Sequence, residues 1–199
     1  MIDPVFMWLT VLLSVVGNGR YALHTLRGET QPNRVTWFLW GVIPLIAFFA
    51  EINEGVGLQS MMTLACGLGP LLVFTASLLN KKAFWQISRL DIVCGVLSVV
   101  TVVLWRLSGS GDLAIALSMV ADGLAGVPTL VKSWHHPESE TDTPFLLGCF
   151  SASITLMTIK TWNFANFGFP AYILVMCLML FCLVRFKLGH RFGGVAETI

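Results

Sequence analysis

The sequence predicts an all-α integral membrane protein with seven transmembrane helices, and three observations lead to this fold class. Apolar residues make up 56% of the 199 residues and charged residues only 12%, whereas a soluble domain carries roughly 25% charged residues. Apolar runs long enough to cross a bilayer recur along the chain, and Lys and Arg gather in alternate loops. The net charge of +1 gives no electrostatic reason to expect nucleic acid as a partner. The apolar runs make the lipid bilayer the expected partner.

The first four predicted spans cover residues 5–26, 35–49, 58–79 and 92–107. A spanning helix needs about 20 mainly apolar residues, because the hydrocarbon core is about 30 Å thick. The second and fourth runs are shorter than this, so their helices must extend into the flanking residues. The interior of the fourth run, from Ile92 to Leu104, has no charged side chain.

The last three predicted spans cover residues 113–133, 145–161 and 168–184. The fifth has Asp122 near its middle, the sixth begins directly after Pro144, and the seventh ends before Arg185. With them the chain crosses the bilayer seven times, which places its two ends on opposite faces.

The distribution of positive charge supports seven crossings and predicts the orientation. Lys and Arg in short loops collect on the cytoplasmic face, and seven spans divide them nine against two. One face receives Arg27, Arg34, Lys81, Lys82, Arg89, Lys132, Arg185, Lys187 and Arg191, and the other receives Arg106 and Lys160. We therefore expect the N-terminus outside and the C-terminus in the cytoplasm.

An internal repeat divides the chain into two similar parts. Residues 36–41 align with residues 143–148 at an offset of 107, and Asn18-Gly19 aligns with Asp122-Gly123 at an offset of 104. Two tandem three-helix units keep the same orientation only if one more helix separates them. The sequence thus predicts a 3+1+3 plan of parallel repeats: a first bundle over residues 1–80, a linker helix over 81–108, and a second bundle with a short cytoplasmic tail over 109–199.

This plan, together with the segment Val127-Pro128-Thr129-Leu130-Val131-Lys132-Ser133, resembles the PQ-loop and SWEET-like superfamily, which includes sugar transporters and vesicular amino-acid exporters. The family's Pro-Gln dipeptide corresponds to Pro128-Thr129 here, and the first repeat has His24-Thr25 without a proline. The resemblance implies that Pro44 and Pro128 are counterparts of the family's helix prolines. It identifies the chain as a distant member, and it implies a transporter.

Asp122 is the clearest candidate site residue, because an ionisable side chain at mid-membrane costs at least about 2.5–3.5 kcal/mol. The repeat makes Asn18 its counterpart, and Arg20 lies two residues further along the same helix. We expect Asp122, Asn18 and Arg20 to converge on one central cavity, where Asp122 binds a substrate or a coupling proton with Arg20 as counter-ion. The alternative is a purely structural role for Asp122, either in a pair with Arg20 or as a protonated acid hydrogen-bonded to a neighbouring helix. Glu51 and Lys160 are expected to be solvated helix ends.

The function expected from these features is transport of a small polar solute by alternating access, passive or coupled to protons. The candidate binding or coupling residues are Asp122, Asn18, Arg20, Thr129, Pro128 and Pro44. The alternative is a receptor or sorting protein that uses Lys81, Lys82 and Lys132 as a cytoplasmic partner surface. The sequence has no HExxH or GxSxG motif and no CxxC pair, so we expect neither an enzyme nor a cofactor nor a metal site. A homo-oligomer remains open.

Overall fold

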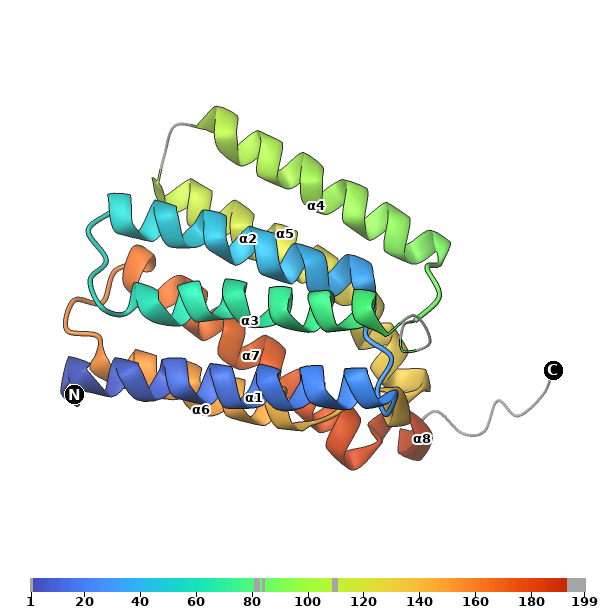
Figure 1. Ribbon diagram of the computed structural model, residues 1–199. Coiled ribbons are helices and arrows are strands. Elements are labelled where there is room, and N and C mark those ends of the chain that lie inside the picture. Colours follow the sequence, from blue (N-terminus) through green and yellow to red (C-terminus); the bar gives the residue numbers. More distant parts are fainter. Residues whose placement is uncertain (1, 81–82, 84, 109–110, 193–199) are drawn as a thin grey trace.

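The computed structural model of the protein is a bundle of long helices (Figure 1). It describes residues 2–80, 83, 85–108 and 111–192, with the backbone alone at 105–108 and 111. The helices are α1 (Met7–Arg27), α2 (Arg34–Asn53), α3 (Ser60–Leu79), α4 (Arg89–Ser108), α5 (Gly111–His135), α6 (Thr143–Thr158), α7 (Phe164–Phe186) and α8 (Leu188–Phe192). Two short 3-10 turns, η1 (Pro4–Phe6) and η2 (Pro137–Ser139), precede α1 and follow α5.

Five of these helices are long and apolar enough to cross a membrane: α1, α2, α3, α5 and α7. The membrane class of the prediction is consistent with this finding. Helix α6 is apolar but has only 16 residues, which is about 24 Å at the usual rise of 1.5 Å per residue. Helix α4 is not among the five, and the side chains of its last four residues lie outside the description.

Local sequence signals fix where the helices begin and end. Helix α1 stops at Gly28, whose φ of 79° lies in the left-handed region that favours glycine. Asn33 begins α2, because its side-chain oxygen accepts hydrogen bonds from the backbone N–H groups of Val35 and Thr36. Asn163 caps the start of α7 in the same way, by accepting from the N–H of Asn166.

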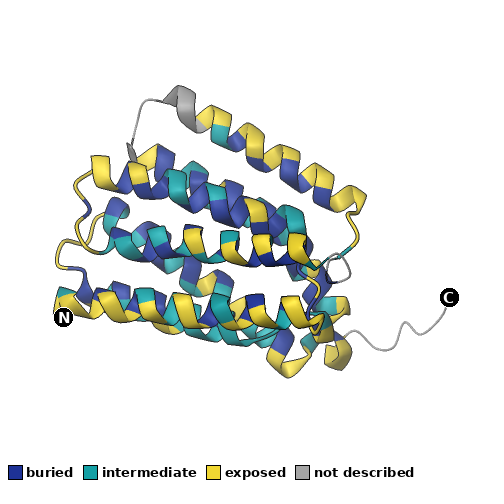
Figure 2. Ribbon diagram, viewed as in Figure 1, coloured by how far each residue is buried: buried dark blue, intermediate teal, exposed yellow. Residues whose placement is uncertain are grey.

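The helices form two layers of three, with α4 added at one edge (Figure 1). In the front layer α3 lies between α1 and α2, and in the rear layer α7 lies between α5 and α6. The layers meet where α1 packs on α6 and α2 packs on α5. Helix α4 packs mainly on α5 and leaves a long apolar face exposed (Figure 2).

Consecutive helices run in opposite directions, so alternate loops share one end of the bundle (Figure 1). We call the end that holds the α1–α2, α3–α4 and α5–α6 loops and α8 the basic end. Its described positive residues are Arg27, Arg34, Arg89, Lys132, Arg185, Lys187 and Arg191. Lys81 and Lys82, which the charge argument also used, lie outside the described residues, and so does the side chain of Arg106 at the opposite end.

Candidate functional site

A cavity of about 100 Å³ lies between the two layers. All six helices of the layers line it, and none of its lining residues belongs to α4. It reaches from the middle of the bundle toward the basic end. The lining residues are Ser14, Asn18, Trp37, Trp40, Pro44, Cys66, Pro70, Asp122, Pro144, Phe145, Gly148, Ser151, Ile173, Met176, Cys177 and Leu180.

Asp122 is the one acidic residue that lines this cavity. Its Oδ2 accepts a hydrogen bond from the Tyr172 hydroxyl at 2.7 Å. Its Oδ1 is buried and has no hydrogen-bond partner among the described residues. The indole Nε1 of Trp40 donates to the backbone carbonyl of Asp122 at 3.1 Å, which fixes the Trp40 ring beside the acid. The arrangement therefore leaves one carboxyl oxygen of a cavity-lining residue without a hydrogen-bond donor among the described residues.

Asn18 lines the same cavity from α1. Its Nδ2 donates to the backbone carbonyl and the hydroxyl of Ser14, at 3.0 and 3.2 Å. A glycine on α3 makes room for it: a Cβ built on Gly69 would lie 2.3 Å from the Asn18 Nδ2. Asn18 and Asp122, which the predicted repeat aligns with each other, thus line one cavity from opposite layers.

The predicted approach of Arg20 to Asp122 is not found. Arg20 is on the exposed face of α1, away from the cavity, and Tyr172 is the side chain that Asp122 contacts through a hydrogen bond. Side chains two residues apart on an α-helix point in directions about 200° apart. A helix that directs Asn18 inward therefore directs Arg20 outward. This rules out both the counter-ion role and the structural Arg20–Asp122 pair in this conformation.

The other candidate residues divide between the cavity wall and the helix packing. Pro44 lines the cavity from inside α2. Pro128 and Thr129 are on α5 but do not line it. The Thr129 hydroxyl is buried and has no hydrogen-bond partner within the described part of the chain.

Glu51 is a buried acid that the sequence analysis placed in solvent. Its exposure is 2%, and its Oε1 accepts from the Thr63 hydroxyl at 3.0 Å. Its Oε2, like Asp122 Oδ1, is buried without a partner among the described residues. Thr63 and Cys66 lie three residues apart, on one face of α3, and this spacing was the available signal, because a polar face directed inward needs polar neighbours.

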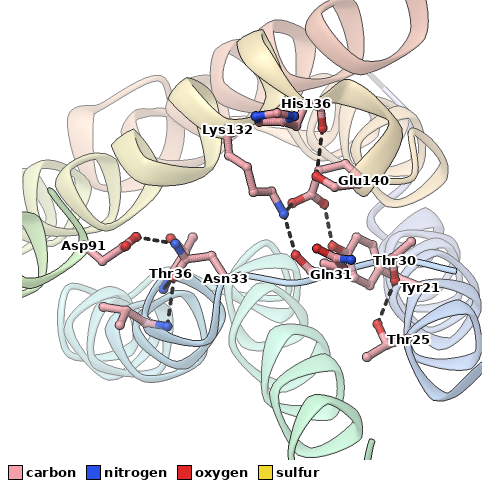
Figure 3. A network of polar contacts seen from close by, with 12 residues as sticks. Tyr21, Thr25, Thr30, Gln31, Asn33, Thr36, Asp91, Lys132, His136 and Glu140 are labelled. Atoms are coloured by element: carbon pink, nitrogen blue, oxygen red, sulfur yellow. Dashed lines mark hydrogen bonds and ion pairs between the residues drawn. The ribbon is translucent and has the colours of Figure 1, made fainter. Parts of the chain in front are cut away.

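A buried polar network lies beyond the cavity at the basic end (Figure 3). Lys132 on α5 pairs with Glu140, which precedes α6, and its Nζ donates to the carbonyl of Gln31 at 2.6 Å. The Tyr21 hydroxyl on α1 donates to Glu140 Oε2 at 2.5 Å. We call Tyr21, Gln31, Lys132 and Glu140 the basic-end network. It connects the two layers, because Tyr21 and Gln31 come from the first and Lys132 and Glu140 from the second.

The network borders the cavity through aromatic contacts. The rings of Tyr21 and Trp37 lie 4.5 Å apart, centre to centre, and Trp37 lines the cavity. Lys132 also lies 5.2 Å from the centre of the Trp85 ring, in cation–π geometry. The receptor alternative places Lys132 on an exposed partner surface, whereas its exposure is 3%.

The chain was compared with protein-family models, with curated proteins and with solved structures, and no match was found in any of the three comparisons.

Proposed function

We propose that the protein is a membrane transporter that carries a small polar solute by alternating access. In this proposal α1 to α7 all span the bilayer, the two layers are repeated three-helix bundles, and α4 is the linker that keeps them parallel. The N-terminus is outside and the basic end is cytoplasmic, in keeping with the positive-inside rule. The chain would then be a distant member of the PQ-loop and SWEET-like superfamily.

The packing of the helices supports a repeat. In each layer the third helix lies between the first and the second. The contacts between layers have the same symmetry, because the first helix of each packs on the second helix of the other. Glycines at equivalent places admit the third helix: a Cβ on Gly41 would lie 2.4 Å from the Leu71 side chain, and one on Gly148 would lie 2.6 Å from that of Cys177.

The cavity is the observation that carries the proposal. Ten of its sixteen lining residues form five pairs related by the repeat offsets, so equivalent positions of the two proposed bundles border one central space. The pairs are Asn18 with Asp122, Trp37 with Pro144, Pro44 with Ser151, Cys66 with Ile173, and Pro70 with Cys177. A site at the interface of two repeats, near mid-membrane, is where transporters of this architecture bind their substrates.

Different kinds of contact lie beyond the two ends of the cavity, and we take them as the two gates. At the basic end the gate is the polar basic-end network. Toward the opposite end it is an apolar cluster that includes Met7, Met62, Ile115 and Phe169. Alternating access would open these gates in turn as the bundles rock about the cavity.

Uptake into proteoliposomes tests the proposal. Wild-type protein should accelerate the entry of at least one member of a panel of labelled sugars, amino acids, nucleosides and small amines, with or without a pH gradient. Asp122→Asn should lower that rate at least about tenfold, since a hydrogen bond to a charged group is worth about 1.5–3 kcal/mol. Glu54→Gln, a change of an exposed acid at the end of α2, is the matched control. Absence of flux for the whole panel would count against transport.

A receptor that binds without transport is the alternative, and the same preparation separates the two. It predicts saturable binding without flux. The burial of Lys132 removes one of the three lysines from the partner surface on which that alternative relied, so transport is the function we favour.

A further inference from the structure

Two buried acids lack a structural explanation. Among the described residues, the fully buried charged side chains are Glu51, Asp91, Asp122, Lys132 and Glu140. Glu140 is paired with Lys132. Asp91 lies in the first turn of α4 and accepts hydrogen bonds from the Asn33 side chain and from the backbone N–H of Ser88. Asp122 and Glu51 remain, each with one oxygen that has a partner and one that has none among the described residues.

Neither protonation state satisfies these carboxyl groups. An ionised carboxylate would leave a charged oxygen without a donor, which is costly in a bilayer. A neutral carboxyl would carry its O–H either on that oxygen, where no described group accepts it, or on the other oxygen, which leaves a buried carbonyl without a donor. A buried polar atom without a partner requires an explanation such as a missing water, ion or ligand.

The charge balance of the cavity selects the class of ligand. Among the described residues, Lys132 is the one buried cation, and it is already paired with Glu140 beyond the cavity. Asp122 is the one charged group on the wall, so the wall offers a carboxylate to a cation and no positive side chain to an anion. A zwitterionic amino acid would leave its own carboxylate unpaired.

The walls favour an organic cation over a metal ion. Trp40 is fixed beside Asp122, and Trp37 and Phe145 also line the cavity; aromatic faces attract cations. The described residues contain no group of three His, Cys, Asp or Glu side chains placed to hold a metal. A cavity of about 150 Å³ holds benzene, so about 100 Å³ suits a molecule of roughly four non-hydrogen atoms.

We propose that the cavity binds a small organic cation with N–H donors, such as a guanidinium or short alkylammonium group, through Asp122 Oδ1 and the Trp40 ring. Glu51 is the next acid on its route toward the opposite end. Thr63, which donates to Glu51, lies one turn of α3 from Cys66 in the cavity wall. Movement of the cation across the membrane rests on the proposed function, whereas its binding does not.

Three planar ions or molecules of nearly equal size test the charge preference: guanidinium, neutral urea and nitrate. Each has about four non-hydrogen atoms, so the cavity volume does not distinguish them. Calorimetric titration of purified wild-type protein should give saturable guanidinium binding, with urea at least about tenfold weaker and nitrate not bound, because charge-assisted hydrogen bonds are roughly twice as strong as neutral ones. Asp122→Asn should reduce guanidinium affinity to the level of urea, and Glu54→Gln should leave it unchanged.

Uptake of labelled guanidinium then separates the two proposals. Saturable uptake that Glu51→Gln slows at least about threefold, with binding retained, supports the cation and its route. Guanidinium binding without uptake keeps the cation site and contradicts transport. Uptake of a neutral solute without competition from guanidinium would support the transport proposal and contradict the proposal of a cation site. The cation proposal is also overturned if wild-type protein binds guanidinium and urea with equal affinity, or if it binds neither while remaining monodisperse on gel filtration. Both outcomes are measured on wild-type protein, so the test does not depend on whether the Asp122 variant folds.

Discussion

Lys132 Nζ lies 2.5 Å from Glu140 Oε1, and the side chains are 1% and 0% exposed. Both charges of the pair lie in the rear layer, but its remaining hydrogen bonds reach the front layer: Gln31 accepts from Lys132, and Tyr21 donates to Glu140. A buried ion pair is stable only when such further bonds compensate for the water that both charges lose. Packing of the two layers at the basic end is therefore coupled to the hydrogen bonds that stabilise this pair.

Breaking the pair from one side should be strongly destabilising. Lys132→Met or Glu140→Gln alone should each lower the free energy of unfolding by about 3–5 kcal/mol, because one buried charge is left unpaired. The double variant should lose less than the sum of the two, since no unpaired charge remains while the new side-chain amide can still accept from Tyr21. Denaturant unfolding in detergent micelles measures all three.

The matched control for this cycle is Arg185→Met. Arg185 pairs with Asp142 at the same end, but at 3.4 Å and with its side chain 64% exposed, so its loss should cost less than about 1 kcal/mol. Strictly additive effects of Lys132→Met and Glu140→Gln would contradict coupling between the two side chains.

Tyr21→Phe should increase the fraction of molecules that are open at the basic end, without changing a residue of the cavity lining. It removes the hydroxyl that ties α1 to Glu140, and a net loss of about 1.5 kcal/mol would raise the open population roughly tenfold. A variant that keeps Cys177 as its single cysteine reports opening, because Cys177 lines the cavity. An impermeant maleimide added from the basic end should label it about tenfold faster after Tyr21→Phe. Unchanged labelling, or equal acceleration by Thr75→Val on the exposed side of α3, would argue against a closure at Tyr21.

The sequence could predict where the helices lie but not how each is rotated. The predicted apolar runs coincide with α1 to α7 within a few residues, because hydrophobic length is a local property. Which side of a helix faces inward depends on its neighbours. Arg20 shows the consequence: it shares α1 with Asn18, and the packing that directs Asn18 to the cavity exposes Arg20.

Long-range partners were the second part that the sequence could not supply. Asp122 was identified from its depth in an apolar run, but Tyr172, which is 50 positions further along, became its partner only in the folded chain. Glu51 was misplaced because it lies two residues before the end of α2, where helix-end acids are commonly solvated. Its burial follows from the approach of Thr63 on α3.

A methyl group at Gly69 on α3 should displace the Asn18 side chain and lower the stability of the protein. The Cβ of Gly69→Ala would lie 2.3 Å from Asn18 Nδ2, so the amide must leave its place against Ser14, and overpacking of this kind costs about 1–3 kcal/mol. Gly19→Ala on α1 is the control, because nothing lies within 4 Å of its Cβ; it should be neutral or stabilising by up to about 1 kcal/mol. Thermal unfolding in detergent compares them, and equal midpoints would mean that α3 does not confine Asn18.

Under the proposed transport mechanism, Pro44→Ala should make α2 more stable and solute uptake slower. Proline has no N–H to donate to the carbonyl four residues earlier, so Pro44 leaves the helix weak where it borders the cavity. Alanine restores that bond and should raise the unfolding free energy by about 1 kcal/mol or more, while the uptake rate falls because the bundle bends less readily at this point. Pro144→Ala is the control: Pro144 borders the same cavity but lies in the first turn of α6, where the N–H has no helical acceptor, so neither quantity should change. If the Pro44→Ala variant were more stable than wild type but showed the same uptake rate, Pro44 would not act as a hinge in α2. The proposed rocking of the bundles would then have to depend on the loops.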